Sequence, residues 1–297
     1  MSPKYVIAFD IGGTKTLVAL IDKNGKILFK QKHPTSKESP EDIISMIVDQ
    51  TAELSASKGI DMADVIALSI GVAGTVDVKG GTVIVAPHLP LDNAPLKRMI
   101  TNRVSLPVHI DNDATLAALG ESRYGAGQGV RNMIMLVVGT GIGGGIILNG
   151  EVYRGAAGGA GEIGHMVIDL NGPEDDCGAR GCLEALASGD AIGEMAGGIS
   201  GEQVAQSAGK GDQNALRVLK RAGKSLGTGL ANLVNIFDPE MIVLGGGVML
   251  TDEIIREEAT RIVKETALRP NRDDVRIVVS ELGEDATLLG AAALLFD

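Results

Sequence analysis

Three glycine-rich segments stand directly after short apolar runs, where their backbone could bind an anion. They are Gly12–Lys15, Gly139–Gly145 and Gly245–Gly247. Glycine has no Cβ, so several backbone N–H groups can turn toward one phosphate. A sharp turn without a ligand explains any single segment about as well. Three such segments in one chain, two of them with a Gly-Thr pair, favour a nucleotide ligand.

Two further glycine patterns match nucleotide-binding motifs only superficially. Gly139–Gly144 fits G-x-G-x-x-G, but residues 146–150 predict a strand and a turn where a dinucleotide fold needs a helix. Gly223–Ser225 fits the end of a P-loop, but Val218 stands where that motif needs its first glycine. The sequence therefore predicts neither a Rossmann fingerprint nor a Walker motif.

Two carboxylates and an amide stand together in Asp111-Asn112-Asp113, between an apolar run and an expected helix. A carboxylate at the carboxyl end of a strand can act as a general base in a ligand-binding crevice. The same side chains can instead cap the helix N-terminus. On the tripeptide alone, capping is the stronger interpretation.

A histidine and the two cysteines of the chain form a third candidate site. The spacing of His165, Cys177 and Cys182 suits a zinc site with one unusual ligand. Two reduced thiols and a surface histidine are the alternative, about equally favoured by the residue types. Two cysteines are too few for a disulfide scaffold.

Composition excludes several classes of function. The chain of 297 residues has a net charge of −11, 2% aromatic residues and no Trp. This balance argues against nucleic acid and anionic membranes as main partners. Asp10 interrupts any signal-peptide core, and the uncharged stretch 132–150 contains six glycines, which favour two strands and a turn over a membrane span. We expect a soluble, cytoplasmic protein.

The elements that must position these residues alternate between strands and helices. Both halves begin with two strands joined through glycines, followed by βα units, which predicts two similar α/β lobes with a cleft between them. The expected strands are 5–9, 16–21, 27–32, 65–71, 108–111, 133–138, a strand after Gly145 and 241–244; the expected helices are 40–58, 113–123, 216–237 and 285–295.

The motifs in this order resemble the ROK family of sugar kinases and repressors over essentially the whole chain. They are Asp-Ile-Gly-Gly-Thr-Lys, Asp-Asn-Asp-Ala, Gly-Thr-Gly-Ile-Gly-Gly-Gly, Gly-Glu-Ile-Gly-His, Cys-Gly-x-x-Gly-Cys-x-Glu and Leu-Gly-Gly-Gly. The resemblance implies the two-lobed, actin-like ATPase fold (ribonuclease H-like) with an interlobe cleft. It implies a small α/β domain over 1–112, joined by the C-terminal helix at about 285–297, and a large α/β domain over 113–284.

The resemblance also implies an activity, which is the ATP-dependent phosphorylation of a hexose, glucose above all, at the 6-hydroxyl. An N-acetylmannosamine kinase shares the same motifs and is the alternative. The family's repressors carry an N-terminal helix-turn-helix extension; this chain starts four residues before its first expected strand and is acidic, which disfavours a regulator. Relatives commonly form homodimers or homotetramers.

Site roles follow from the resemblance position by position. Asp113 is the base; Asn112, Glu162, His165 and Glu184 bind sugar hydroxyls, and Gly74 lies in a sugar-side loop; Asp10, Gly12, Gly13, Thr14 and Lys15 face the ATP phosphates and Mg²⁺; Thr140 and Gly141 hold phosphate from the other lobe; Gly245 and Gly246 lie near the adenosine.

The family's zinc pattern departs from this sequence at one position. Asp175 stands where the family has the first Cys of Cys-x-Cys-Gly. Because zinc accepts carboxylate ligands, His165, Asp175, Cys177 and Cys182 remain the expected structural Zn²⁺ site, with weaker affinity.

Overall fold

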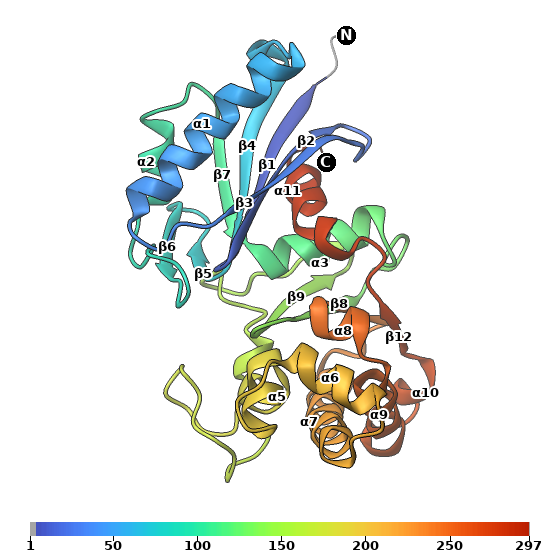
Figure 1. Ribbon diagram of the computed structural model, residues 1–297. Helices are drawn as coiled ribbons and strands as arrows, with labels where there is room; N and C mark the ends of the chain where they lie inside the picture. The colour runs from blue at the N-terminus through green and yellow to red at the C-terminus, as the bar shows by residue number, and fades with distance from the viewer. Residues whose placement is uncertain (1–3, 297) are drawn as a thin grey trace. The chain divides into compact units, whose positions relative to one another are not determined.

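A computed structural model gives the fold and describes residues 4–296, which divide into two compact units (Figure 1). The first unit comprises the described residues of Met1–Gln128, Val152–Ala160 and Glu284–Asp297, and the second comprises Gly129–Glu151 and Gly161–Gly283. This division falls later than the expected boundary after residue 112. The helix that follows residue 112 stays with the first unit because it packs along the C-terminal helix.

The first unit is built on a five-stranded mixed sheet with the strand order β3-β2-β1-β4-β7. β1, β2 and β3 are antiparallel neighbours, whereas β1, β4 and β7 run parallel, so the carboxyl ends of these three strands share one edge. The elements are β1 (Tyr5–Ile11), β2 (Lys15–Asp22), β3 (Ile27–Pro34), α1 (Pro40–Lys58), a 3₁₀ turn (Met62–Asp64), β4 (Val65–Val72), β5 (Thr75–Asp77), β6 (Thr82–Val85), α2 (Leu96–Thr101), β7 (Val108–Asn112), α3 (Asp113–Tyr124), a 3₁₀ turn (Gly283–Asp285) and α11 (Ala286–Phe296).

Helices cover both faces of this sheet, α1 and α2 on one and α3 and α11 on the other (Figure 1). On the α1 face, Ile7 and Phe9 belong to one buried apolar cluster with Ile43 and Ile47. On the other face, α3 and α11 cross closely at a glycine. A Cβ on Gly290 would lie 1.8 Å from a backbone oxygen of α3, so only glycine fits there.

The second unit repeats the plan with the strand order β10-β9-β8-β11-β12. β8 and β9 are antiparallel, and β8, β11 and β12 run parallel. The elements are β8 (Met133–Val138), β9 (Ile142–Leu148), β10 (Glu151–Val152), a 3₁₀ turn (Ile163–His165), α4 (Glu184–Ala187), α5 (Gly189–Met195), α6 (Gly201–Gly209), α7 (Gln213–Phe237), β11 (Met241–Gly245), α8 (Gly247–Thr251), α9 (Glu253–Thr266), α10 (Asn271–Asp274) and β12 (Arg276–Val279).

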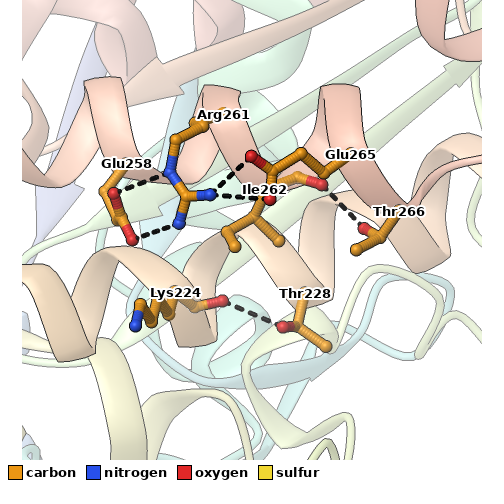
Figure 2. Close-up of polar contacts among 7 residues, drawn as sticks. All are labelled: Lys224, Thr228, Glu258, Arg261, Ile262, Glu265 and Thr266. Atoms are coloured by element: carbon orange, nitrogen blue, oxygen red, sulfur yellow. Dashed lines mark hydrogen bonds and ion pairs between the residues drawn. The ribbon is translucent and has the colours of Figure 1, made fainter.

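The long helices α7 and α9 pack side by side and support this second sheet. Cβ atoms on Gly223 and Gly227 would lie within 3.0 Å of atoms of α9, so these glycines let the two backbones approach closely. Figure 2 shows the exposed rim of this contact, where Arg261 pairs with Glu258 and Glu265 on its own helix at 2.6 Å each. Exposed pairs of this kind contribute little stability, so burial and close packing hold the helices together.

The structure corrects the predicted extent of the second glycine segment. Gly143–Gly145, expected to belong to a glycine loop, lie inside strand β9, where Gly144 pairs with Leu136. A Cβ on Gly144 would meet the Gly161 carbonyl oxygen at 2.6 Å, so close backbone approach explains the glycine. Among the described residues, none of the helices is long and apolar enough to cross a membrane.

Candidate functional site

Three residues of the first unit lie in register at the carboxyl ends of β1, β4 and β7. Asp10 of β1 pairs with Gly71 of β4, which in turn pairs with Asp111 of β7. Asp113 begins α3, two residues beyond Asp111. The parallel register therefore places Asp10 and Asp113 at the same sheet edge, which is where ligands bind in α/β folds.

Asn112, and not Asp113, is the residue that caps α3. The Asn112 side-chain oxygen accepts the Thr115 N–H at 2.8 Å. Its amide nitrogen donates to the Gly74 carbonyl and to Asp113 Oδ1, both at 3.1 Å. The same Asp113 oxygen accepts the Ala114 N–H at 2.8 Å. Asn112, a predicted sugar-side residue, is thus bonded directly to the predicted base, and Gly74 is linked to that base through the Asn112 side chain.

Asp10, the second carboxylate at this edge, has a raised pKa. Burial, followed by the charge of Asp113, raises the pKa of Asp10 to about 7, although Lys15 opposes the shift. Lys15 itself pairs with Glu284 at 3.2 Å, and Glu284 also pairs with Lys30 at 3.0 Å. A negatively charged edge of this kind is suited to a cation with oxygen ligands.

The predicted phosphate loop of the first unit is the tight connection between β1 and β2. The Gly12 N–H donates to the Lys15 carbonyl at 3.0 Å, so this donor serves the turn. A Cβ on Gly13 would lie 2.6 Å from His88 Cβ, so the loop is packed against a neighbouring segment. Thr14 is the remaining residue of the turn, and Lys15 already belongs to β2.

A buried ion pair involves Asp111, the residue immediately before Asn112. Arg154 donates to Asp111 Oδ2 from Nε at 3.2 Å and from Nη2 at 2.5 Å, and the Asp111 side chain is 3% exposed. The other Asp111 oxygen accepts the Asn112 N–H at 2.9 Å. Sequence analysis did not single out Arg154, and no short motif around it indicates an ion-pair partner 43 residues away.

In the second unit, the predicted phosphate loop at the end of β8 is bound to Glu184. Glu184 accepts a hydrogen bond from the Ile142 N–H, and a Cβ on Gly141 would lie 2.3 Å from a Glu184 carboxylate oxygen. A side chain at position 141 would therefore displace the Glu184 carboxylate from its present place. The structure joins a residue predicted to bind sugar with the loop predicted to bind phosphate.

A cavity of about 1110 Å³ opens beside this loop, at the ends of β8 and β11. Gly139 and Thr140 line it on one side and Gly247 on another, whereas α5 and α6 contribute Asp190 and Gln206. Gly245 and Gly246 lie just behind, where a Cβ on Gly246 would meet a Val138 backbone atom at 2.3 Å. Among the described residues that line the cavity, none is Lys, Arg or His. Four carboxylates line the cavity, those of Asp190, Glu194, Glu202 and Asp252, so it suits a small molecule that carries no negative charge in this part.

The sequence analysis did not single out the cavity walls that α5 and α6 contribute. One signal was available there. Ser200 and Gln203 form a capping box at the start of α6, with hydrogen bonds of 3.2 Å and 2.9 Å between side chains and backbone. The spacing S-x-x-Q marks a helix N-terminus in a sequence.

The four predicted zinc ligands lie together in the second unit. One ligand atom from each of His165, Asp175, Cys177 and Cys182 lies within 4.8 Å of all the others. The two sulfurs are 3.6 Å apart, close to the ~3.8 Å that a tetrahedral zinc with 2.3 Å bonds requires. A turn at Gly178, with φ of +85°, brings the cysteine side of this cluster to Asp175. The donor set therefore fits a zinc ion.

Hydrogen bonds also link the side chains of this cluster. Burial favours the neutral acid, but hydrogen bonds from Cys177, Cys182 and His165 outweigh it and lower the pKa of Asp175. Burial, followed by its hydrogen bonds to Asp175 and Cys177, raises the pKa of Cys182 to about 12. His165 uses Nδ1 toward Asp175 at 3.0 Å, so its Nε2 points to the other side of the ring. Glu162 immediately precedes the short turn that carries His165.

Comparison with known proteins places the chain in a family. The model of the ROK family matches residues 6–297, and the chain belongs to this family. A glucokinase from Streptomyces coelicolor is 34% identical over 97% of this chain and 96% of its own length. A putative xylose repressor from Caldicellulosiruptor sp. strain Rt8B.4 is also 34% identical, over 97% of this chain and 77% of its own length.

Solved structures agree with this assignment. The crystal structure of a ROK family glucokinase from Streptomyces griseus, in complex with glucose and AMPPNP, has a TM-score of 0.84 and 36% identity, covering 98% of each chain. The actin-like fold predicted from the motifs is confirmed. Kinases and repressors are about equally similar to this chain, so the family defines a sugar kinase or a sugar-responsive regulator.

Proposed function

We propose that this protein is an ATP-dependent hexose kinase that transfers the γ-phosphoryl group of ATP to the 6-hydroxyl of glucose. The observation that carries the proposal is that two neighbouring residues have different roles at the start of α3. Asn112 provides the helix cap, so capping does not account for Asp113. Asp113 instead lies near the second carboxylate, Asp10, at the kind of sheet edge where α/β folds bind ligands.

In this proposal Asp113 is the general base. It accepts the proton of the sugar hydroxyl while the hydroxyl oxygen bonds to the γ-phosphorus and the bond to the β-phosphate oxygen breaks, giving sugar phosphate and ADP. Hydrogen bonds from Ala114 and Asn112 hold one Asp113 oxygen in place. Asn112, Gly74, Glu162, His165 and Glu184 are proposed to bind or position the sugar.

The nucleotide is assigned to the predicted glycine segments. The uncharged nucleoside suits the cavity beside Thr140 and Gly247, which lacks cationic lining residues among those described. Gly245 and Gly246 would support the adenosine side, and Thr140 and Gly141 a phosphate. Asp10 would hold Mg²⁺ beside the loop Gly12–Lys15, and when bound this ion neutralises charge on the phosphate oxygens.

The proposed structural zinc ion would be held by His165, Asp175, Cys177 and Cys182, and its binding would order the segment that presents His165. With Nδ1 committed to the cluster, Nε2 of His165 is the ring nitrogen available for a sugar hydroxyl.

Product analysis tests the proposal. The protein is incubated with ATP, Mg²⁺ and glucose, and the position of the new phosphate ester is determined by NMR. Glucose 6-phosphate is the expected product. A phosphate ester formed with N-acetylmannosamine, and none with glucose, would replace glucose by the alternative substrate. The similarity to xylose repressors gives a second candidate, a regulator without turnover, for which no hexose would be phosphorylated.

A further inference from the structure

From the buried ion pair behind the sheet edge we infer that Arg154 is a positioning residue for Asp113, an inference that rests on the proposed kinase reaction. The two side chains belong to distant parts of the first unit. Asp111 ends β7, whereas Arg154 lies in the short segment Val152–Ala160. The Asp111 carboxylate is nearly inaccessible to water, and Arg154 supplies two hydrogen bonds to one of its oxygens.

A continuous series of hydrogen bonds leads from the guanidinium to the proposed base. Arg154 fixes Asp111 Oδ2, and Asp111 Oδ1 accepts the Asn112 N–H at 2.9 Å. The Asn112 side chain then donates to Asp113 Oδ1 at 3.1 Å. Each bond restricts the next group, so the orientation of the Asp113 carboxylate depends on Arg154 although Arg154 acts through two intervening residues.

Hydrogen bonding within the loop fixes the backbone of Arg154, from which the guanidinium extends. The Ala160 N–H donates to the Arg154 carbonyl at 3.1 Å and closes the segment into a loop. Gly155 and Gly158 adopt φ values of +70° and +88°, conformations that permit this tight loop. The residues on either side of this loop, Glu151 and Gly161, belong to the second unit, whereas the loop itself belongs to the first.

Arg154 could serve only to neutralise the buried charge of Asp111, or it could also orient the Asp111 carboxylate. A buried carboxylate without a partner is strongly unfavourable, and any cation would relieve that cost. The forked contact of Nε and Nη2 adds orientation, which a point charge does not supply. The two roles separate in a double variant that removes both charges.

The test compares turnover and stability in four variants. Arg154→Met should lower kcat about 10- to 100-fold, as expected for a displaced base, with the KM for ATP unchanged within about twofold. Arg154→Lys keeps the positive charge but loses the paired contact of Nε and Nη2. Its kcat should lie between those of the wild type and Arg154→Met. Arg103→Met is the matched control, because Arg103 pairs with Glu41 at the exposed surface of the same unit; its kcat should equal that of the wild type.

The double variant Asp111→Asn/Arg154→Met decides between the roles. Positioning predicts that its Tm recovers toward the wild-type value while kcat stays low, because no buried charge remains but the orientation is still lost. Recovery of kcat together with Tm would overturn the inference, and so would wild-type kcat in a folded Arg154→Met protein. Absence of turnover by the wild type on any hexose would instead overturn the proposed function, and this inference with it.

Discussion

Asp113 is the residue on which the proposed chemistry depends most directly. If Asp113 is the base, Asp113→Asn should lower kcat by about 10²-fold or more, because the amide cannot accept the hydroxyl proton. Glucose binding, measured by calorimetry, should be nearly unchanged because Asn112 still caps α3. A variant that keeps near-wild-type kcat and loses only thermal stability would show that Asp113 is a structural residue of the helix start.

Asp10 gives a second prediction at the residue scale, in metal-free protein. Its folded-state pKa of about 7 lies above the ordinary value of 3.8, so the native state binds the proton more tightly and stability falls as pH rises through this window. Asp10→Asn removes this cost and should raise Tm by about 5 °C at pH 8. At pH 4 the gain should nearly vanish.

Thermal unfolding at both pH values, with a chelator present, checks this expectation. Asp49→Asn, at an exposed position of α1, serves as a control for loss of one carboxylate from the same unit. An equal Tm change at pH 4 and pH 8 would contradict the assignment of a raised pKa to Asp10.

We expect the segment that carries His165 and the cysteines to depend on a bound metal for its order. We predict about one zinc per chain in protein purified without chelator, held by the four clustered ligands. Asp175→Cys should strengthen binding about tenfold, because a thiolate is a softer ligand than a carboxylate. Cys177→Ser should weaken binding and raise the KM for sugar more than that for ATP.

Elemental analysis and competition with a chelator measure this affinity. Asp176→Asn is the matched control, since Asp176 neighbours Asp175 in sequence but is outside the ligand cluster. Protein without zinc, together with an unchanged sugar KM in Cys177→Ser, would mean that His165 acts without a metal.

Elements with strong local signals could be predicted from the sequence. Pro40 begins α1 as expected, and Gly59, with φ of +62°, follows its end. The Asn149-Gly150 turn has positive φ at both residues, as its hairpin type requires. Three regions of the site depended on contacts distant in sequence: the β9 glycines, the cavity walls from α5 and α6, and the pairing of Arg154 with Asp111.

The same contrast applies to individual site residues. The four clustered candidate metal ligands could be named in advance because short spacings and a family motif identify them. The hydrogen bonds of Asn112 could not, because cap and ligand roles use the same side-chain atoms. Only the register of three parallel strands shows that Asp10 and Asp113 share one edge.

At the scale of the whole molecule, net charge separates a kinase from a DNA-binding regulator. The chain carries −11 charges, so duplex DNA should be repelled at low salt rather than attracted. We predict no salt-sensitive binding in a gel-shift titration with promoter DNA of sugar-utilisation genes. Tight binding that weakens steeply with salt would favour the regulator.

Hexose-dependent ADP release by the wild-type protein tests the central claim most directly. The protein is assayed with ATP and Mg²⁺ in the presence of glucose, mannose, fructose, N-acetylglucosamine or N-acetylmannosamine. The proposed function predicts ADP release that requires a sugar and is fastest with glucose. Release at the sugar-free rate with all five sugars would contradict it.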